Sequence, residues 1–152
     1  MVDPKVLIHR ISRIIAATRF PFVDQETWDE DYQTIVNDEV NRFGIKWEGG
    51  ITYPSIVILR GDGGVQELGM VEPTEAVGTE SVAKWQMLSD AASVGRVHKK
   101  FFLYVPHGQE EAALKLLEAN DVDYDGLRGY DIVDGSLKIY PHKTRNDASD
   151  HR

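Results

Sequence analysis

The apolar positions near the N-terminus recur with the period of a helix. Those of one face follow one another at intervals of three or four residues: Leu7, Ile11, Ile14, Ile15 and Thr18. Pro4 precedes them, and proline is favoured in a first helical turn because its missing N–H would have no partner there. The pattern predicts a helix that begins at Pro4 and ends at the run 19–22.

A second periodic stretch follows a helix-start signal. Thr27 and Glu30 are spaced as a capping box, in which each side chain bonds the backbone N–H of the other. The apolar arc behind it consists of Trp28, Tyr32, Ile35, Val36, Val40 and Phe43. Gly44 is a natural stop. We therefore expect a helix from Thr27 to Phe43.

The middle of the chain has the pattern of paired strands. Ile45–Trp47 is followed by a turn at Gly49-Gly50, and Ile56–Leu59 is apolar on both faces, which is typical of a central strand. The glycine-rich turn 61–64 leads into Val65–Glu72. We expect the last two segments to pair as a hairpin, antiparallel to each other.

Helices and strands alternate in the second half. The patterns predict helices over Thr79–Ala92 and Gln109–Ala119 and strands over Phe101–Val105, Leu127–Val133 and Leu137–Tyr140. The fold class is therefore α/β (α+β), with a mixed central sheet and helices on both faces. We expect one domain over residues 1–140 and a polar, disordered tail over 141–152.

Composition narrows the class of protein. The 152 residues carry a net charge of −8 and include no cysteine, which excludes disulfides, thiolate zinc sites and a cysteine nucleophile. No apolar run is long enough to cross a bilayer, and the start lacks the pattern of a signal peptide, so a cytoplasmic protein without a membrane partner is expected. An acidic chain binds DNA poorly unless its basic residues cluster.

Several short motifs occur in the order of a known superfamily. They are Phe43-Gly44, Pro54-Ser55, Met70-Val71-Glu72, Lys84-Trp85-Gln86, Tyr104-Val105-Pro106 and Gly126-Leu127-Arg128-Gly129-Tyr130. Together they resemble the restriction-endonuclease-like, or PD-(D/E)xK, nuclease superfamily. The resemblance implies a core of a helix, a three-strand meander, a helix and a strand, here preceded by an extra N-terminal helix.

The resemblance also implies a metal site, and this sequence departs from it. In the superfamily, a Pro-Asp pair and an acid on the third strand hold Mg²⁺, which activates water against a phosphodiester. Ser55 and Met70 stand at those two positions, and neither is an anionic ligand. Glu72 remains, at the position where lysine is commoner. Glu39, inside the apolar arc, is expected to be buried within one water of Glu72 or Ser55.

Other signals have ordinary structural explanations beside functional ones. Arg96, His98, Lys99 and Lys100 form the densest basic run, and they are candidate phosphate contacts or a solubilising end of a helix. Trp85 is a core residue or a platform for base stacking. Glu39 is a remnant of a catalytic site, or an acid at the edge of the core whose carboxylate reaches solvent or pairs with Lys or Arg. Glu72 is such a remnant, or an ordinary acid at a strand end before Pro73.

Three functions follow from these alternatives. The first is a catalytically degenerate nuclease-fold protein that acts as a binding or scaffolding module, with DNA or a nuclease-system protein as candidate partner. The second is an active endonuclease that uses Mg²⁺ at a relocated acidic site built on Glu39 and Glu72. The third is a protein-interaction domain unrelated to nucleic acid. No cofactor is expected for the first and third, and the oligomeric state stays open.

Overall fold

The computed structural model describes residues 4–20, 31–92 and 100–145. The helices are α1 (Pro4–Arg19), α2 (Val82–Ala91) and α3 (Glu110–Ala119). The strands are β1 (Gln33–Val36), β2 (Ile45–Trp47), β3 (Gly50–Thr52), β4 (Ile56–Leu59), β5 (Val65–Val71), β6 (Phe101–Pro106), β7 (Gly126–Val133) and β8 (Ser136–Thr144). Short 3₁₀ turns at Thr74–Ala76 and Thr79–Ser81 lead into α2.

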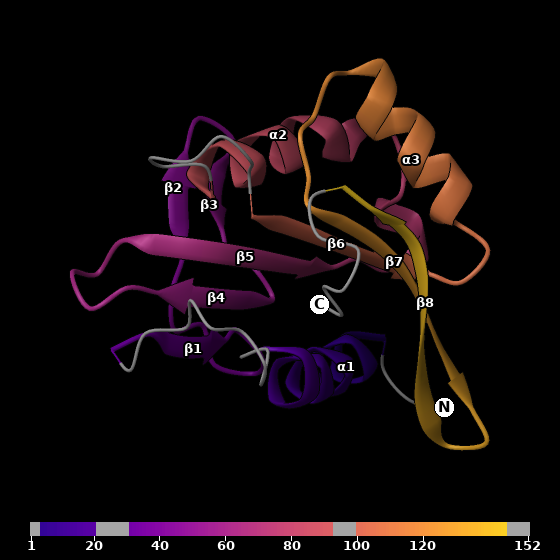
Figure 1. The fold of residues 1–152 in the computed structure, drawn as a ribbon, viewed down its shortest axis with the longest axis horizontal. Coiled ribbons are helices and arrows are strands. Elements are labelled where there is room, and N and C mark those ends of the chain that lie inside the picture. Colours follow the sequence, from indigo (N-terminus) through magenta and orange to yellow (C-terminus); the bar gives the residue numbers. More distant parts are fainter. Residues whose placement is uncertain (1–3, 21–30, 93–99, 146–152) are drawn as a thin grey trace.

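Six strands form one mixed sheet in the order β1-β4-β5-β6-β7-β8. β4 lies inside the sheet and pairs antiparallel with both β1 and β5, as its two apolar faces predict. β6 is parallel to β5 and to β7, and β8 returns antiparallel to β7. The predicted fold class, a mixed sheet with helices on both faces, is confirmed (Figure 1).

Two hydrophobic cores lie on opposite faces of this sheet. On one face α2 and α3 pack over the strands, and Trp85, Leu103 and Leu117 are among the fully buried residues. On the other face α1 packs over Ile56, Ile58, Phe102 and neighbouring side chains. Burial alternates along β4, where Ile56 and Ile58 belong to one core and Val57 to the other. This alternation is the two-residue period of a strand that is covered on both sides.

The expected helix over Thr27–Phe43 is wrong for the part that the structure describes. Residues 27–30, with the capping box, lie outside the described residues. Gln33–Val36 forms the edge strand β1, which pairs with β4. Thr34, Ile35 and Val36 are β-branched, and such side chains lose rotamer freedom in a helix but pack well on a pleated sheet. Pairing with an apolar strand therefore outweighed the helical spacing.

Two further boundaries differ from the sequence interpretation. β2 and β3 form a separate two-stranded hairpin, so the first strand of the antiparallel meander is β1. β8 continues through Pro141 to Thr144, beyond the expected end of order at Tyr140, because it stays paired with β7 along that length. The remainder of the expected tail, 146–152, lies outside the described residues.

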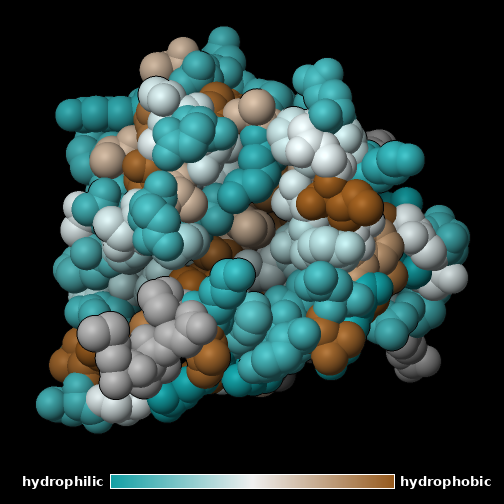
Figure 2. All heavy atoms as spheres, turned by 180° about the vertical axis from the view of Figure 1, so that it is seen from behind, coloured by the Kyte–Doolittle hydropathy of each residue, from teal (hydrophilic) through white to brown (hydrophobic). Residues whose placement is uncertain are grey.

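The surface that faces away from the viewer in Figure 1 is largely hydrophilic. On this side the hydrophobic residues that the structure describes form small, separate groups (Figure 2). The exposed large apolar side chains among the described residues are Val6, Val40, Ile51 and Tyr53. Within that part of the chain, no helix is long and apolar enough to cross a membrane.

Candidate functional site

Ser55, Met70 and Glu72, the three positions singled out on the second and third strands of the meander, meet at one corner of the sheet. They line a cavity of about 290 Å³, to which α1 contributes Ile8, His9 and Ser12. Ser55 immediately precedes β4, and Glu72 immediately follows β5. Because β4 and β5 are antiparallel neighbours, the start of one strand lies beside the end of the other. The expected juxtaposition of these three residues is therefore present.

The hydroxyl of Ser55 is used within the protein. It accepts a hydrogen bond of 2.9 Å from the backbone N–H of Val71 and donates toward the sulfur of Met70 at 3.8 Å. Ser55 is buried, so this N–H would otherwise lack a partner. Ser55 thus stabilises the end of β5, while Met70 fills space beside it.

The carboxylate of Glu72 is held by two donors from the first turns of α2. The indole N–H of Trp85 donates to Oε2 at 2.7 Å, and the ammonium of Lys84 lies 2.7 Å from the same oxygen. The hydroxyl of Tyr130 donates to the backbone carbonyl of Glu72 at 2.7 Å. Trp85 is fully buried, as a core residue should be. The sequence interpretation missed Lys84 as a partner, although it directly precedes the predicted inward tryptophan.

Glu39 does not line this cavity, although its Oε1 lies 3.9 Å from Nδ1 of His9, which does, and the expectation that Glu39 is buried is wrong. Its side chain is 55% exposed, and both carboxylate oxygens accept from Nη1 of Arg13 on α1 at 2.9 Å. Glu39 lies in the loop after β1, because the helix that would have directed it inward is absent. A hydrogen bond to its own backbone and the bonds from Arg13 lower the pKa of the Glu39 carboxyl.

The loop that carries Glu39 is organised by a buried asparagine and an ion pair. The side-chain amide of Asn37 donates to the carbonyls of Phe43 and Pro54, and its oxygen accepts from the N–H groups of Arg42 and Phe43. Arg42 also donates to Asp38 at 2.7 Å. This hydrogen bond is the largest cause that lowers the pKa of Asp38 to about 2.

Of the candidate basic cluster at residues 96–100, the structure describes Lys100 alone. Lys100 is paired with the buried carboxylate of Asp125 at 2.8 Å, so its charge is used within the fold. Arg96, His98 and Lys99 lie outside the described residues. Lys100 thus serves the structure at the start of β6 and is not an open phosphate contact.

A histidine that the sequence interpretation did not single out is held at the end of β6. Nδ1 of His107 lies 2.7 Å from Oε2 of Glu110, and the ring stacks on Tyr140 with centroids 3.8 Å apart. The other oxygen of Glu110 accepts from the N–H of Gly108. The spacing of His107, Gly108 and Glu110 just before a helix was the available signal. The arrangement fixes the loop between β6 and α3.

The chemistry of the predicted site follows from these contacts. Mg²⁺ requires several oxygen ligands, usually carboxylates and water. Among the residues that the structure describes, no group of three or more His, Cys, Asp or Glu side chains is placed to hold a metal ion. At the cavity itself, Ser55 and Met70 bond to each other and Glu72 is neutralised by Lys84.

Comparisons of the chain with protein-family models, with curated proteins and with solved structures each gave no match.

Proposed function

We propose that this chain is a non-catalytic binding module built on a restriction-endonuclease-like framework. The order of elements supports the framework: α1, an antiparallel meander of β1, β4 and β5, then α2 and the parallel strand β6. The hairpin of β2 and β3 is inserted between the first two strands of the meander. Pro54-Ser55 comes directly before the second meander strand, where the superfamily carries Pro-Asp.

The observation that carries the proposal is that the carboxylate of Glu72 is already paired within the fold. Catalysis by this superfamily needs carboxylates that face a metal, and here Glu72 is the single acid among the three matching positions. Its Oε2 already accepts from both Trp85 and Lys84. A metal at Glu72 would have to displace an ammonium, and Ser55 and Met70 would offer it no charge in exchange. Binding without chemistry is the function that suits this arrangement.

A protein partner fits the described charges better than DNA does. The net charge of −8 repels phosphates over the distances at which nucleic acids are attracted to a surface. Lys100 is held by Asp125, and Arg13 and Arg42 are paired with Glu39 and Asp38. DNA is the competing candidate, and it would have to contact basic residues other than these three, with Arg96, His98 and Lys99 as the sequence candidates.

The test combines a metal titration with a cleavage assay. We expect no Mg²⁺- or Mn²⁺-dependent change at the amides of Ser55, Met70 and Glu72 in NMR spectra, and no cleavage of DNA or RNA. Ser55→Asp combined with Met70→Glu restores both carboxylates and should create metal-dependent shifts at this corner. Metal-dependent cleavage by the wild type that Glu72→Ala abolishes and Glu75→Gln leaves intact would refute the proposal, because Glu75 lines the same cavity but is exposed.

The kind of partner is tested separately by fluorescence anisotropy with labelled double-stranded DNA at increasing salt. A protein-binding module should bind weakly even at low salt. Tight binding that falls steeply as salt rises would identify DNA as the partner, since counterion release produces that dependence. That outcome would overturn the choice of partner and leave the argument about catalysis standing.

A further inference from the structure

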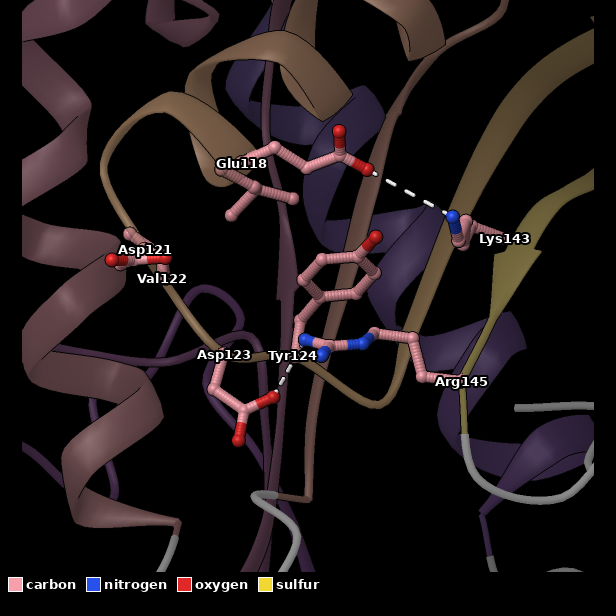
Figure 3. A pocket seen from close by; sticks show the side chains of 8 residues that line it. Glu118, Asp121, Val122, Asp123, Tyr124, Lys143 and Arg145 are labelled. Carbon is pink, nitrogen blue, oxygen red and sulfur yellow. Dashed lines mark hydrogen bonds and ion pairs between the residues drawn. The ribbon is translucent and has the colours of Figure 1, made fainter.

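A second cavity lies at the other side of the sheet, where α3 ends and β8 finishes. Its volume is about 460 Å³, within the range of small-molecule sites. It shares no lining residue with the cavity at Ser55. Its charged and polar lining residues are Glu118, Asp121, Asp123, Tyr124, Lys143 and Arg145 (Figure 3).

Tyr124 presents a hydroxyl group to this cavity that the fold does not use. The residue is 2% exposed, and its hydroxyl makes no hydrogen bond with the described part of the chain. Figure 3 shows the hydroxyl pointing toward the space between Glu118 and Lys143. The hydroxyl oxygen is not among the fully buried unpaired atoms of the described residues, so it reaches the cavity and can bond a ligand there. Burial is the main cause that raises the pKa of Tyr124, so this group stays protonated and can donate.

Opposite charges stand side by side above that hydroxyl. Nζ of Lys143 and Oε1 of Glu118 are 3.8 Å apart, which is longer than a hydrogen bond. Both side chains are about half exposed, so each keeps bonding capacity for a ligand. A loose pair of this kind contributes little to stability by itself.

The remaining cation is fixed in place. Nη1 of Arg145 donates to Asp123 at 2.7 Å, and its guanidinium lies over the ring of Tyr124, 5.0 Å from the centroid. Arg145 thus lies over the ring, and the hydroxyl at the far end of the ring points away from the guanidinium (Figure 3). Leu117 and Val122 add apolar wall to the same cavity.

We propose that this cavity binds a small zwitterion, specifically a free α-amino acid with an aliphatic side chain. The ligand carboxylate pairs with Lys143 and accepts from the Tyr124 hydroxyl, while the ligand ammonium pairs with Glu118. The two charges of an α-amino acid are separated by a distance comparable to that between Lys143 and Glu118, so both pairs form together. The aliphatic side chain lies against Leu117 and Val122.

The mixed lining argues against a ligand with a single charge. An anion without an ammonium would lie beside Glu118 and Asp121, and a cation without a carboxylate would lie beside Lys143 and Arg145. Like charges in contact disfavour either arrangement. This inference stands on the second cavity alone and does not depend on the absence of catalysis at Glu72.

The first experiment is an NMR titration of the full chain, labelled with ¹⁵N, with three probes. L-Leucine should shift the amides of Tyr124 and Lys143. N-acetyl-L-leucine lacks the ammonium and L-leucinamide lacks the carboxylate, and each should bind about ten-fold more weakly or worse, because one charge-assisted contact is lost. Equal binding of all three probes, or no shift with L-leucine, would overturn the proposal.

The second experiment assigns the contacts by matched variants. Tyr124→Phe removes the hydroxyl and should weaken L-leucine binding about ten-fold or more, because the lost hydrogen bond is one to the charged carboxylate of the ligand. Lys143→Gln should weaken it further. Tyr140→Phe and Lys138→Gln are controls on β8, since neither residue lines the cavity. Unchanged affinity in Tyr124→Phe would contradict the proposed pose, and the three-probe comparison decides the case if that variant fails to fold.

Discussion

The paired carboxylate of Glu72 predicts that this residue stabilises the fold. Glu72→Ala removes the oxygen that accepts from Trp85 and Lys84, each at 2.7 Å. Trp85 is fully buried, so its indole N–H cannot find water after the substitution. The side chain of Lys84 is 24% exposed, so its ammonium can recover part of its hydration. The lost hydrogen bond from Trp85 should therefore cost more stability than the lost ion pair with Lys84.

The magnitude follows from these two environments. An unpaired buried N–H costs about 1–3 kcal/mol, and the exposed side of the ion pair adds about 1 kcal/mol or less. We expect Glu72→Ala to lower the free energy of unfolding by about 3 kcal/mol, or the melting temperature by about 9 °C. Glu72→Gln keeps an acceptor for the indole and should cost about 1–2 kcal/mol.

Urea denaturation followed by tryptophan fluorescence measures these values. The slope of the unfolding free energy against urea should stay constant if the compactness of both states is unchanged. Glu75→Ala is the matched control, because Glu75 is exposed beside the same cavity and should change stability by about 0.5 kcal/mol at most. A Glu72→Ala variant no less stable than this control would show that the buried carboxylate is not structural.

Three further substitutions test other parts of the fold. The hydrogen bond from Arg42 lowers the pKa of Asp38 from its ordinary 3.8 to about 2. Asp38→Asn should therefore lower stability at neutral pH, and this difference should disappear as the pH falls to about 2 and Asp38 becomes protonated. At that pH the urea midpoints of the two proteins should be the same. Gly108 has φ of 101°, so Gly108→Ala should cost at least about 1 kcal/mol in thermal unfolding. Ser55→Ala removes the acceptor of the Val71 N–H, and hydrogen exchange of that amide should accelerate as stability falls by about 1–3 kcal/mol.

The elements that the sequence predicted correctly have a hydrophobic pattern that fits one type of secondary structure and not another. α1 and α3 have apolar residues on one helical face and charges on the other, and both helices lie where expected. β4 is apolar on both faces, and this composition suits the interior position between β1 and β5. In these segments local preference and tertiary packing agree, so the pattern alone was sufficient.

The segment from 32 to 43 failed because its apolar positions satisfy both periods. Tyr32 and Val36 would share a helical face, but Tyr32, directly before β1, and Val36 within it also pack against the same core as α1. The segment forms a strand because it pairs with β4, about twenty residues later in the sequence. The side-chain amide of Asn37 also donates to the carbonyl of Pro54, just before β4. Contacts between distant segments leave no local signal, and the cluster of β-branched residues was the available hint.

The same non-local dependence limited the prediction of the site. Ser55, Met70 and Glu72 could be brought together in advance because neighbouring strands fix their register. The placement of Glu39 depended on a helix that does not form, so it failed with that helix. Lys84 lay outside the prediction because the helix pattern specifies that Trp85 points inward but not which neighbour then reaches the strand end.

The pairing of Lys84 with Glu72 depends on the neutral side chains of Ser55 and Met70. A carboxylate at position 70 would lie beside Ser55 and near Glu72, and acids so close together would need a cation between them. Lys84 could serve one such acid, but Glu72 would then lose a partner that it has while buried. With serine and methionine in place, a single carboxylate remains, and one lysine and one indole satisfy it without a metal. The neutral side chains at positions 55 and 70 and the pairing of Lys84 with Glu72 are therefore one arrangement, and changing either part alone should destabilise this corner.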